Sequence, residues 1–128
     1  MSSDTKSMVA NYMEAGFLEN ITDMFKADRG LFSILPHLIS DERGRVRLGA
    51  VALVEGVRDA CQKELQAVIP DIAGVLNHSN PTIRADAAYL LGVIGHRDAL
   101  PYLRTVLDDK NPLVRETIQE TIEGLTLT

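Results

Sequence analysis

Residues 80–95 read NPTIRADAAYLLGVIG, and this stretch decides the fold. Asn80 is a good helix N-cap, because its side-chain oxygen can accept a backbone N–H of the first turn. Pro81 then falls at the first helical position, where its missing N–H removes no helical hydrogen bond. Apolar residues recur behind it at helical spacing, and Gly95 can close the helix in a left-handed conformation. The stretch therefore predicts one capped, amphipathic helix.

A second copy of this pattern follows 31 residues later. Residues 69–84 and 100–115 align without a gap. Both contain an apolar residue and proline, an apolar stripe, Asn-Pro, and a β-branched residue before arginine. A weaker copy is anchored on residues 46–47, but its proline, Pro36, is three residues out of register. An internal repeat of this length predicts stacked helical hairpins.

The repeats predict one compact domain. Three hairpins are expected at approximately 30–58, 65–95 and 98–125, within a repeat region of 30–128. In the last hairpin Asn111 is the second predicted helix cap. An N-terminal helical segment precedes the repeats.

Small residues mark where the two helices of one hairpin can pack closely, and the last copy lacks them. Ala87 and Ala88 are replaced there by Ile118 and Gln119. A polar residue at such a position is typical of a capping unit that faces water. We therefore expect the stack to end at residue 125.

The N-terminal segment, 1–29, has an apolar-rich helical stretch at 5–27, with Gly16 as a candidate break between two short helices. One interpretation is a cap over the first hairpin, since the end of a solenoid must not expose its core. The alternative is a methionine-rich docking or homodimerisation face, because methionine adapts to varied partners. The apolar pattern alone leaves both open.

The pattern of residues 80–95, followed by DALPYL at 98–103, closely resembles the short HEAT-like repeat of phycobilin lyases and many bacterial HEAT-repeat proteins. That resemblance implies an all-α fold: a right-handed αα-superhelix of HEAT-like hairpins, here with an N-terminal helical cap. It also implies that the second helices line a concave face where partners bind. Arg47, Arg84 and Arg115 match the family's arginine, which ties neighbouring loops together.

Composition narrows the classes of partner and location. The net charge is −5, which argues against nucleic acid as the main partner, because such binding depends on Lys and Arg contacts with phosphate. The single cysteine, Cys61, cannot form an internal disulfide, so a reducing compartment is expected. No apolar run is long enough for a membrane span, and the N-terminus has no signal pattern. We expect a cytoplasmic protein.

Catalytic and metal-binding patterns are absent from the sequence. His37, His78 and His96 lie in different units and none is followed by Glu, unlike the His-Glu pairs that bind iron in HEAT-like deoxyhypusine hydroxylase. There is no Gly-x-Ser-x-Gly, no phosphate loop and no His-Glu-x-x-His. We therefore expect neither a cofactor nor an enzyme activity. The resemblance to phycobilin lyases keeps one alternative open: an accessory lyase or chaperone-like protein that acts on a cofactor-bearing partner.

The repeat alignment also predicts a partner surface. When the second helices are aligned on their buried positions, five residues point outward on the concave side: Leu48, Ala85, Tyr89, Glu116 and Glu120. This surface runs from apolar through aromatic to acidic, and an outward tyrosine is common at interfaces. The sequence therefore favours a non-catalytic protein-interaction or adaptor module, whose partner is another protein.

Overall fold

The computed structural model describes residues 3–127, in which every regular element is helical. The longer helices are α1 (Ser3–Glu14), α2 (Leu18–Ala27), α4 (Gly44–Val57), α5 (Gln62–Gly74), α6 (Pro81–Ile94) and α8 (Pro112–Thr126). Two five-residue helices are α3 (Leu35–Ile39) and α7 (Leu100–Arg104). Short 3₁₀ segments are η1 (Arg29–Ile34), η2 (Val75–Asn77) and η3 (Arg97–Ala99).

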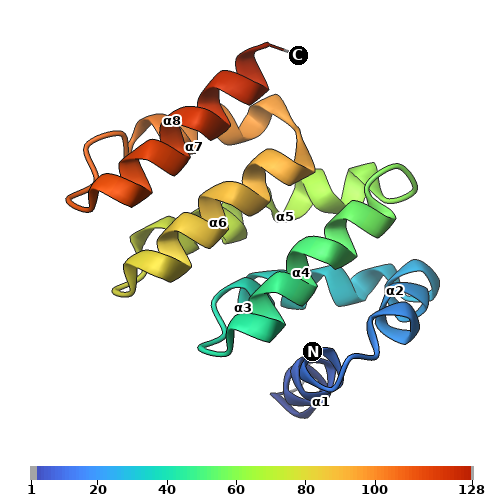
Figure 1. The fold of residues 1–128 in the computed structure, drawn as a ribbon. Helices are drawn as coiled ribbons and strands as arrows, with labels where there is room; N and C mark the ends of the chain where they lie inside the picture. Colours follow the sequence, from blue (N-terminus) through green and yellow to red (C-terminus); the bar gives the residue numbers. More distant parts are fainter. Residues whose placement is uncertain (1–2, 128) are drawn as a thin grey trace.

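The helices form three hairpins: α3 with α4, α5 with α6, and α7 with α8. Figure 1 shows α4, α6 and α8 side by side in one layer, with α3, α5 and α7 behind them. Helices α1 and α2 lie at one end of the stack, and the C-terminus lies at the other. The chain is therefore an all-α solenoid, as the repeat predicted.

The core is aliphatic and follows the helical spacing of the repeats. Nine positions at this spacing in the second helices are buried: Ala50, Leu53, Val57, Ala87, Leu90, Ile94, Ile118, Thr121 and Leu125. The small residues serve the contact between hairpins, because the carbonyl of Ala88 accepts a hydrogen bond from Thr121 Oγ1 of α8 at 3.3 Å. Close packing therefore continues from one hairpin to the next.

The helix ends follow the capping chemistry of their sequences. Asn80 Oδ1 accepts the backbone N–H of Thr82 at 2.9 Å, and Asn111 Oδ1 accepts that of Leu113 at 2.9 Å. Gly95 ends α6 with a φ of 76°, in the left-handed region. In the weaker copy Arg43 holds the cap position of α4 and makes no side-chain capping bond.

Two first helices differ from the sequence-based expectation. The apolar spacing of the last first helix continues to Leu107, but α7 ends at Arg104 and Leu107 is exposed in the turn that follows. The hydroxyl and the N–H of Thr105 both bond the carbonyl of Tyr102, which tightens the chain into a turn. In the middle unit α5 begins at Gln62 and continues through Pro70, instead of starting near residue 65.

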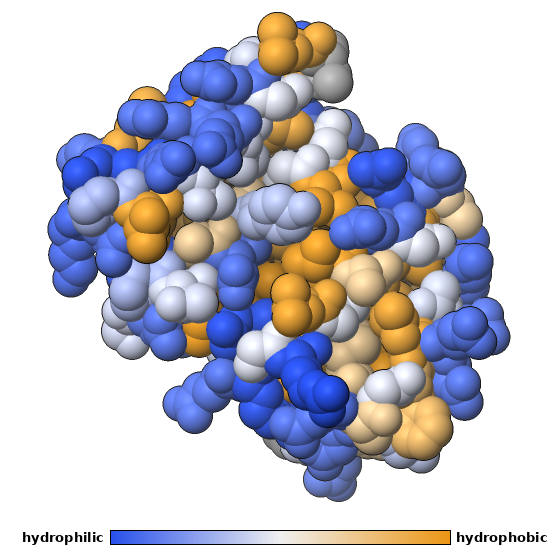
Figure 2. Space-filling view, in the orientation of Figure 1, coloured by the Kyte–Doolittle hydropathy of each residue, from blue (hydrophilic) through white to orange (hydrophobic). Residues whose placement is uncertain are grey.

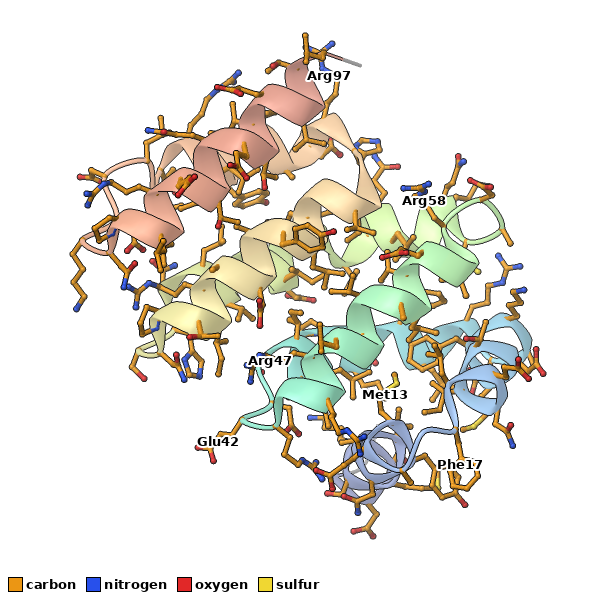
Figure 3. All side chains as sticks on the ribbon, in the orientation of Figure 1. Met13, Phe17, Glu42, Arg47, Arg58 and Arg97 are labelled. Atoms are coloured by element: carbon orange, nitrogen blue, oxygen red, sulfur yellow. The ribbon has the colours of Figure 1, made fainter. Side chains whose placement is uncertain are left out.

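The N-terminal helices pack on α4. Gly16 has a φ of 94° and separates α1 from α2. Met13 points from α1 to α4 (Figure 3), where a Cβ at Gly49 would collide with its side chain. Tyr12 and Phe17 stay exposed in edge-to-face contact, with ring centroids 5.8 Å apart. This end of the stack thus has a buried apolar side and an exposed one.

Candidate functional site

The second helices present one broad surface, which we call the α4/α6/α8 face. Of the residues expected to point outward there, Leu48 is 72% exposed and Tyr89 is 54% exposed. Glu116 and Glu120 are exposed and Ala85 is half-buried. Figure 2 shows an apolar strip across the middle of this face, bordered by hydrophilic atoms. The face therefore combines exposed apolar area with charge at its borders.

A groove of about 720 Å³ lies at one end of this face, where α4, α6 and α8 all end. We call it the α6/α8 groove. Tyr89 and Glu120 line it, whereas Leu48, Ala85 and Glu116 lie outside it. The structure thus brings together two of the five predicted residues and places the other three farther along the face.

Three glycines are among the residues that line the groove, and sequence reasoning did not assign them to it. Gly92 and Gly95 line it from α6, and Gly124 lines it from α8. A Cβ on Gly92 would lie 3.1 Å from Cγ2 of Thr121, so this glycine permits the close approach of the two helices. A Cβ on Gly124 would meet nothing within 4 Å. The sequence signal that could have indicated the groove was a glycine in the interior of each of two neighbouring helices, Gly92 and Gly124.

The groove has charged groups on both sides. Arg58, labelled at the end of α4 in Figure 3, donates from Nη1 to the carbonyl of Val93 at 3.1 Å, while Asp59 follows it in the lining. Glu120 stands on α8 opposite them. The C-terminal ends of three helices also converge here, and each carries partial negative charge from its unpaired carbonyl groups.

The repeated arginines lie at the opposite end of the helices, beside the loops that precede them. Arg84 Nη1 donates to the carbonyls of His78 and Ser79 in its own loop. Its Nε and Nη2 donate to both carboxylate oxygens of Asp109, at 2.9 and 3.0 Å. This fork joins the middle unit to the last one. Because the Arg84 guanidinium bonds it, Asp109 has a pKa below its usual value.

Arg47 makes a related set of bonds one unit earlier. Its Nη1 donates to the carbonyls of Asp41 and Glu42, and its Nε donates to Asp86 Oδ2 of α6 at 2.7 Å. Arg115 donates to the carbonyl of Asp109 at 2.6 Å, and it forms no ion pair with any residue between 3 and 127. The repeated arginines therefore link the first unit to the middle one through Arg47, and the middle unit to the last one through Arg84.

The sequence around the first hairpin also contains a local cluster of arginines, made of Arg43, Arg45, Arg47 and Arg58. Arg43 bonds Asp41 through Nε and Nη2, and reaches Glu14 of α1 at 3.3 Å. Bonding to Arg43 lowers the pKa of Asp41. Two arginines of that cluster, Arg43 and Arg47, thus already hold carboxylates.

Histidines in the loops serve the backbone. Nδ1 of His78 accepts the N–H of Asn80, and Nδ1 of His96 accepts that of Asp98, both at 3.0 Å.

Within the described chain, no three His, Cys, Asp or Glu side chains come together as metal ligands. No helix between residues 3 and 127 is long and apolar enough to cross a bilayer.

Comparison with protein families matches residues 31–123 to HEAT repeats. That span runs from η1 into the last turn of α8, and it leaves out α1 and α2. Comparison with curated proteins gives no match. Among solved structures, an engineered protein is similar, with a TM-score of 0.54 and 18% sequence identity. The alignment covers 93% of this chain and 53% of the engineered one, and the likeness concerns the fold alone.

Proposed function

Since the chain belongs to the HEAT-repeat family, we propose that it is a non-catalytic interaction module that binds another protein on the α4/α6/α8 face. The observation that carries the proposal is the position of Tyr89, in the middle of that face and on the wall of its groove, with 54% of its surface exposed. A half-covered aromatic ring can bury more area against a partner while its hydroxyl keeps a polar contact.

The proposed surface combines what protein interfaces use. Leu48 and Tyr89 supply exposed apolar and aromatic area. The carboxylates of Glu116 and Glu120 border it at the last helix. An aromatic anchor surrounded by polar groups is the usual arrangement of an interface hot spot, in which a few residues supply most of the binding energy.

The groove also supports a second candidate, an accessory protein that handles a cofactor-bearing partner. Its volume of about 720 Å³ lies in the range of small-molecule pockets. Its rim residues Arg58, Tyr89 and Glu120 are exposed, however, so the groove opens along its length to solvent. An open groove fits a protein segment better than a ligand that must be enclosed.

The first test compares two tyrosines of similar exposure. Tyr89→Ala should weaken capture of the natural partner from a lysate of the source organism, measured by quantitative mass spectrometry. Tyr102→Ala is the matched control, because Tyr102 is 38% exposed and lies on α7 in the other layer. A partner retained equally by both variants would contradict the proposal. So would a fall of many degrees in the Tm of Tyr89→Ala, since that would show the ring to be core.

A further inference from the structure

We infer that the α6/α8 groove receives a lysine or arginine side chain from a basic segment of the partner protein. In this arrangement the aliphatic stem crosses the ring of Tyr89 and follows the glycines, and the cationic head meets Glu120. The inference rests on the proposed function, because it names the chemistry of a partner that binds the same face.

The carboxylate of Glu120 is the first reason. Asp41, Asp86 and Asp109 each hold an arginine of this chain. Glu120 lines the groove and forms no ion pair with any residue between 3 and 127. Its neighbours on the exposed side of α8, Glu116 and Glu123, form none within that range either. The groove therefore offers one carboxylate of α8 that holds no cation of the described chain, with two more beside it on the same helix.

The helix ends add to that field. The groove lies at the C-terminal ends of α4, α6 and α8, and each end carries roughly half a negative charge in the dipole description. Arg58 already covers one exposed carbonyl, that of Val93. Two carboxylates, Asp59 and Glu120, line the groove against one cation, Arg58, and the first turn of α5 adds a helix N-terminal end. The formal charge of the lining side chains is negative, so complementarity favours a basic partner segment.

The shape of the groove fits a long unbranched side chain. Gly92 and Gly124 leave gaps between the side chains that line the groove on the two facing helices. A glycine inside a helix is less stable there than alanine by about 1 kcal/mol, and nothing within 4 Å of a Cβ at Gly124 accounts for its presence. Open space beside Tyr89 allows an alkyl stem to pack on the ring and a cation to contact its face.

The test is selection of a peptide library displayed on phage, using the immobilised full chain. A parallel selection on Gly124→Leu removes peptides that do not need the groove, because the new side chain starts from a Cβ that meets nothing within 4 Å and occupies part of the groove. Peptides that bind only the wild type should be enriched in Lys or Arg next to an apolar residue. Enrichment of Asp or Glu in that pool would overturn the inference but leave the proposed face standing. The selected peptides are then tested for binding to Tyr89→Ala. If none of them binds this variant more weakly than wild type, both the inference and the proposed face are overturned.

A charge reversal on one helix then locates the contact. For a selected basic peptide, Glu120→Lys should raise the Kd about tenfold or more, and the loss should shrink as salt is added. Glu123→Lys makes the same change in charge on an exposed residue of α8 outside the groove, so it should change the Kd far less. Equal losses in both variants would show that only the overall charge matters, and would overturn the assignment to the groove.

Discussion

Two contacts between neighbouring units, the first with the middle and the middle with the last, use equivalent arginines of the repeat in different ways. At the first contact the Arg47 and Asp86 side chains are 11% and 38% exposed and share one short bond. At the second, Arg84 and Asp109 are 6% and 8% exposed and share two. The better-matched repeats therefore make the drier and more geometrically specific ion pair.

The repeat alignment explains the choice of carboxylate. Thr117 of α8 corresponds to Asp86 of α6, so Arg84 finds no acid at the position that Arg47 uses. Arg84 pairs instead with Asp109, a loop residue whose equivalent in the preceding repeat is His78. One substitution in a helix and one in a loop thus move the ion pair from a half-exposed helix surface to a buried loop junction.

The largest expected difference is between two isosteric changes. Asp109→Asn should lower the free energy of unfolding by about 3 kcal/mol, because it leaves the buried guanidinium of Arg84 without its counter-charge. Asp86→Asn should cost about 1 kcal/mol or less, since solvent reaches that pair. Urea unfolding followed by circular dichroism measures both. Equal losses would show that the difference in burial has no energetic consequence.

Next in size is the close approach of α6 and α8. Gly92→Val should destabilise the fold by about 2 kcal/mol, because its Cβ alone would lie 3.1 Å from Cγ2 of Thr121 and its two methyl groups add to the crowding. The same change at Gly124, where a Cβ meets nothing, should stay within about 0.5 kcal/mol of wild type. Thermal and urea unfolding compare the two. Adding Thr121→Ser should recover part of the Gly92→Val loss, and no recovery would place the strain elsewhere.

Changes at the helix caps should give smaller differences in the free energy of unfolding between the repeats. Asn80→Ala should cost about 1 kcal/mol, because the N–H of Thr82 loses its side-chain acceptor. Arg43→Ala removes no capping bond, although it does remove the bonds to Asp41 and Glu14. A double variant, Asn80→Ala with Arg43→Ala, should show additive losses in urea unfolding because the sites share no contact. Strong coupling between the two would contradict independent caps.

The pH dependence of stability gives the smallest signal. Asp109 has a lowered pKa in the folded protein, so its contribution is fully present above the unfolded value of about 3.9. That contribution is lost as pH falls through the lower folded value. Wild type should therefore lose stability with acid more steeply than Asp109→Asn below about pH 4. Parallel curves from urea melts across this range would show that Arg84 does not hold the carboxylate.

Much of the fold follows from local chemistry that the sequence displays. Asn80 and Gly95 start and end α6 through contacts within a few residues. The end of α7 was less predictable, because Thr105 competes for the Tyr102 carbonyl through both its hydroxyl and its backbone N–H. Local rules therefore located the helices better than they located a turn with two competing bonds.

The candidate site was harder to predict than the helices. The periodicity of α6 is enough to turn Tyr89 outward, since its neighbour Leu90 must be buried. The groove beside it needs the ends of three helices that are far apart in sequence. Gly124 has meaning only once the empty space around its Cα is known. Single positions could be assigned a side of a helix, but the groove depends on how the units stack.

The most direct test of the central claim, that the α4/α6/α8 face binds a partner protein, is photo-cross-linking from that face. A photoreactive phenylalanine analogue is placed at Tyr89 in one sample and at Tyr102 in another, and each is irradiated in a lysate of the source organism. A covalent adduct of defined mass should form from the Tyr89 position and be absent from the Tyr102 position. Adducts from Tyr102 alone would contradict the claim and move the partner to the opposite layer of the solenoid.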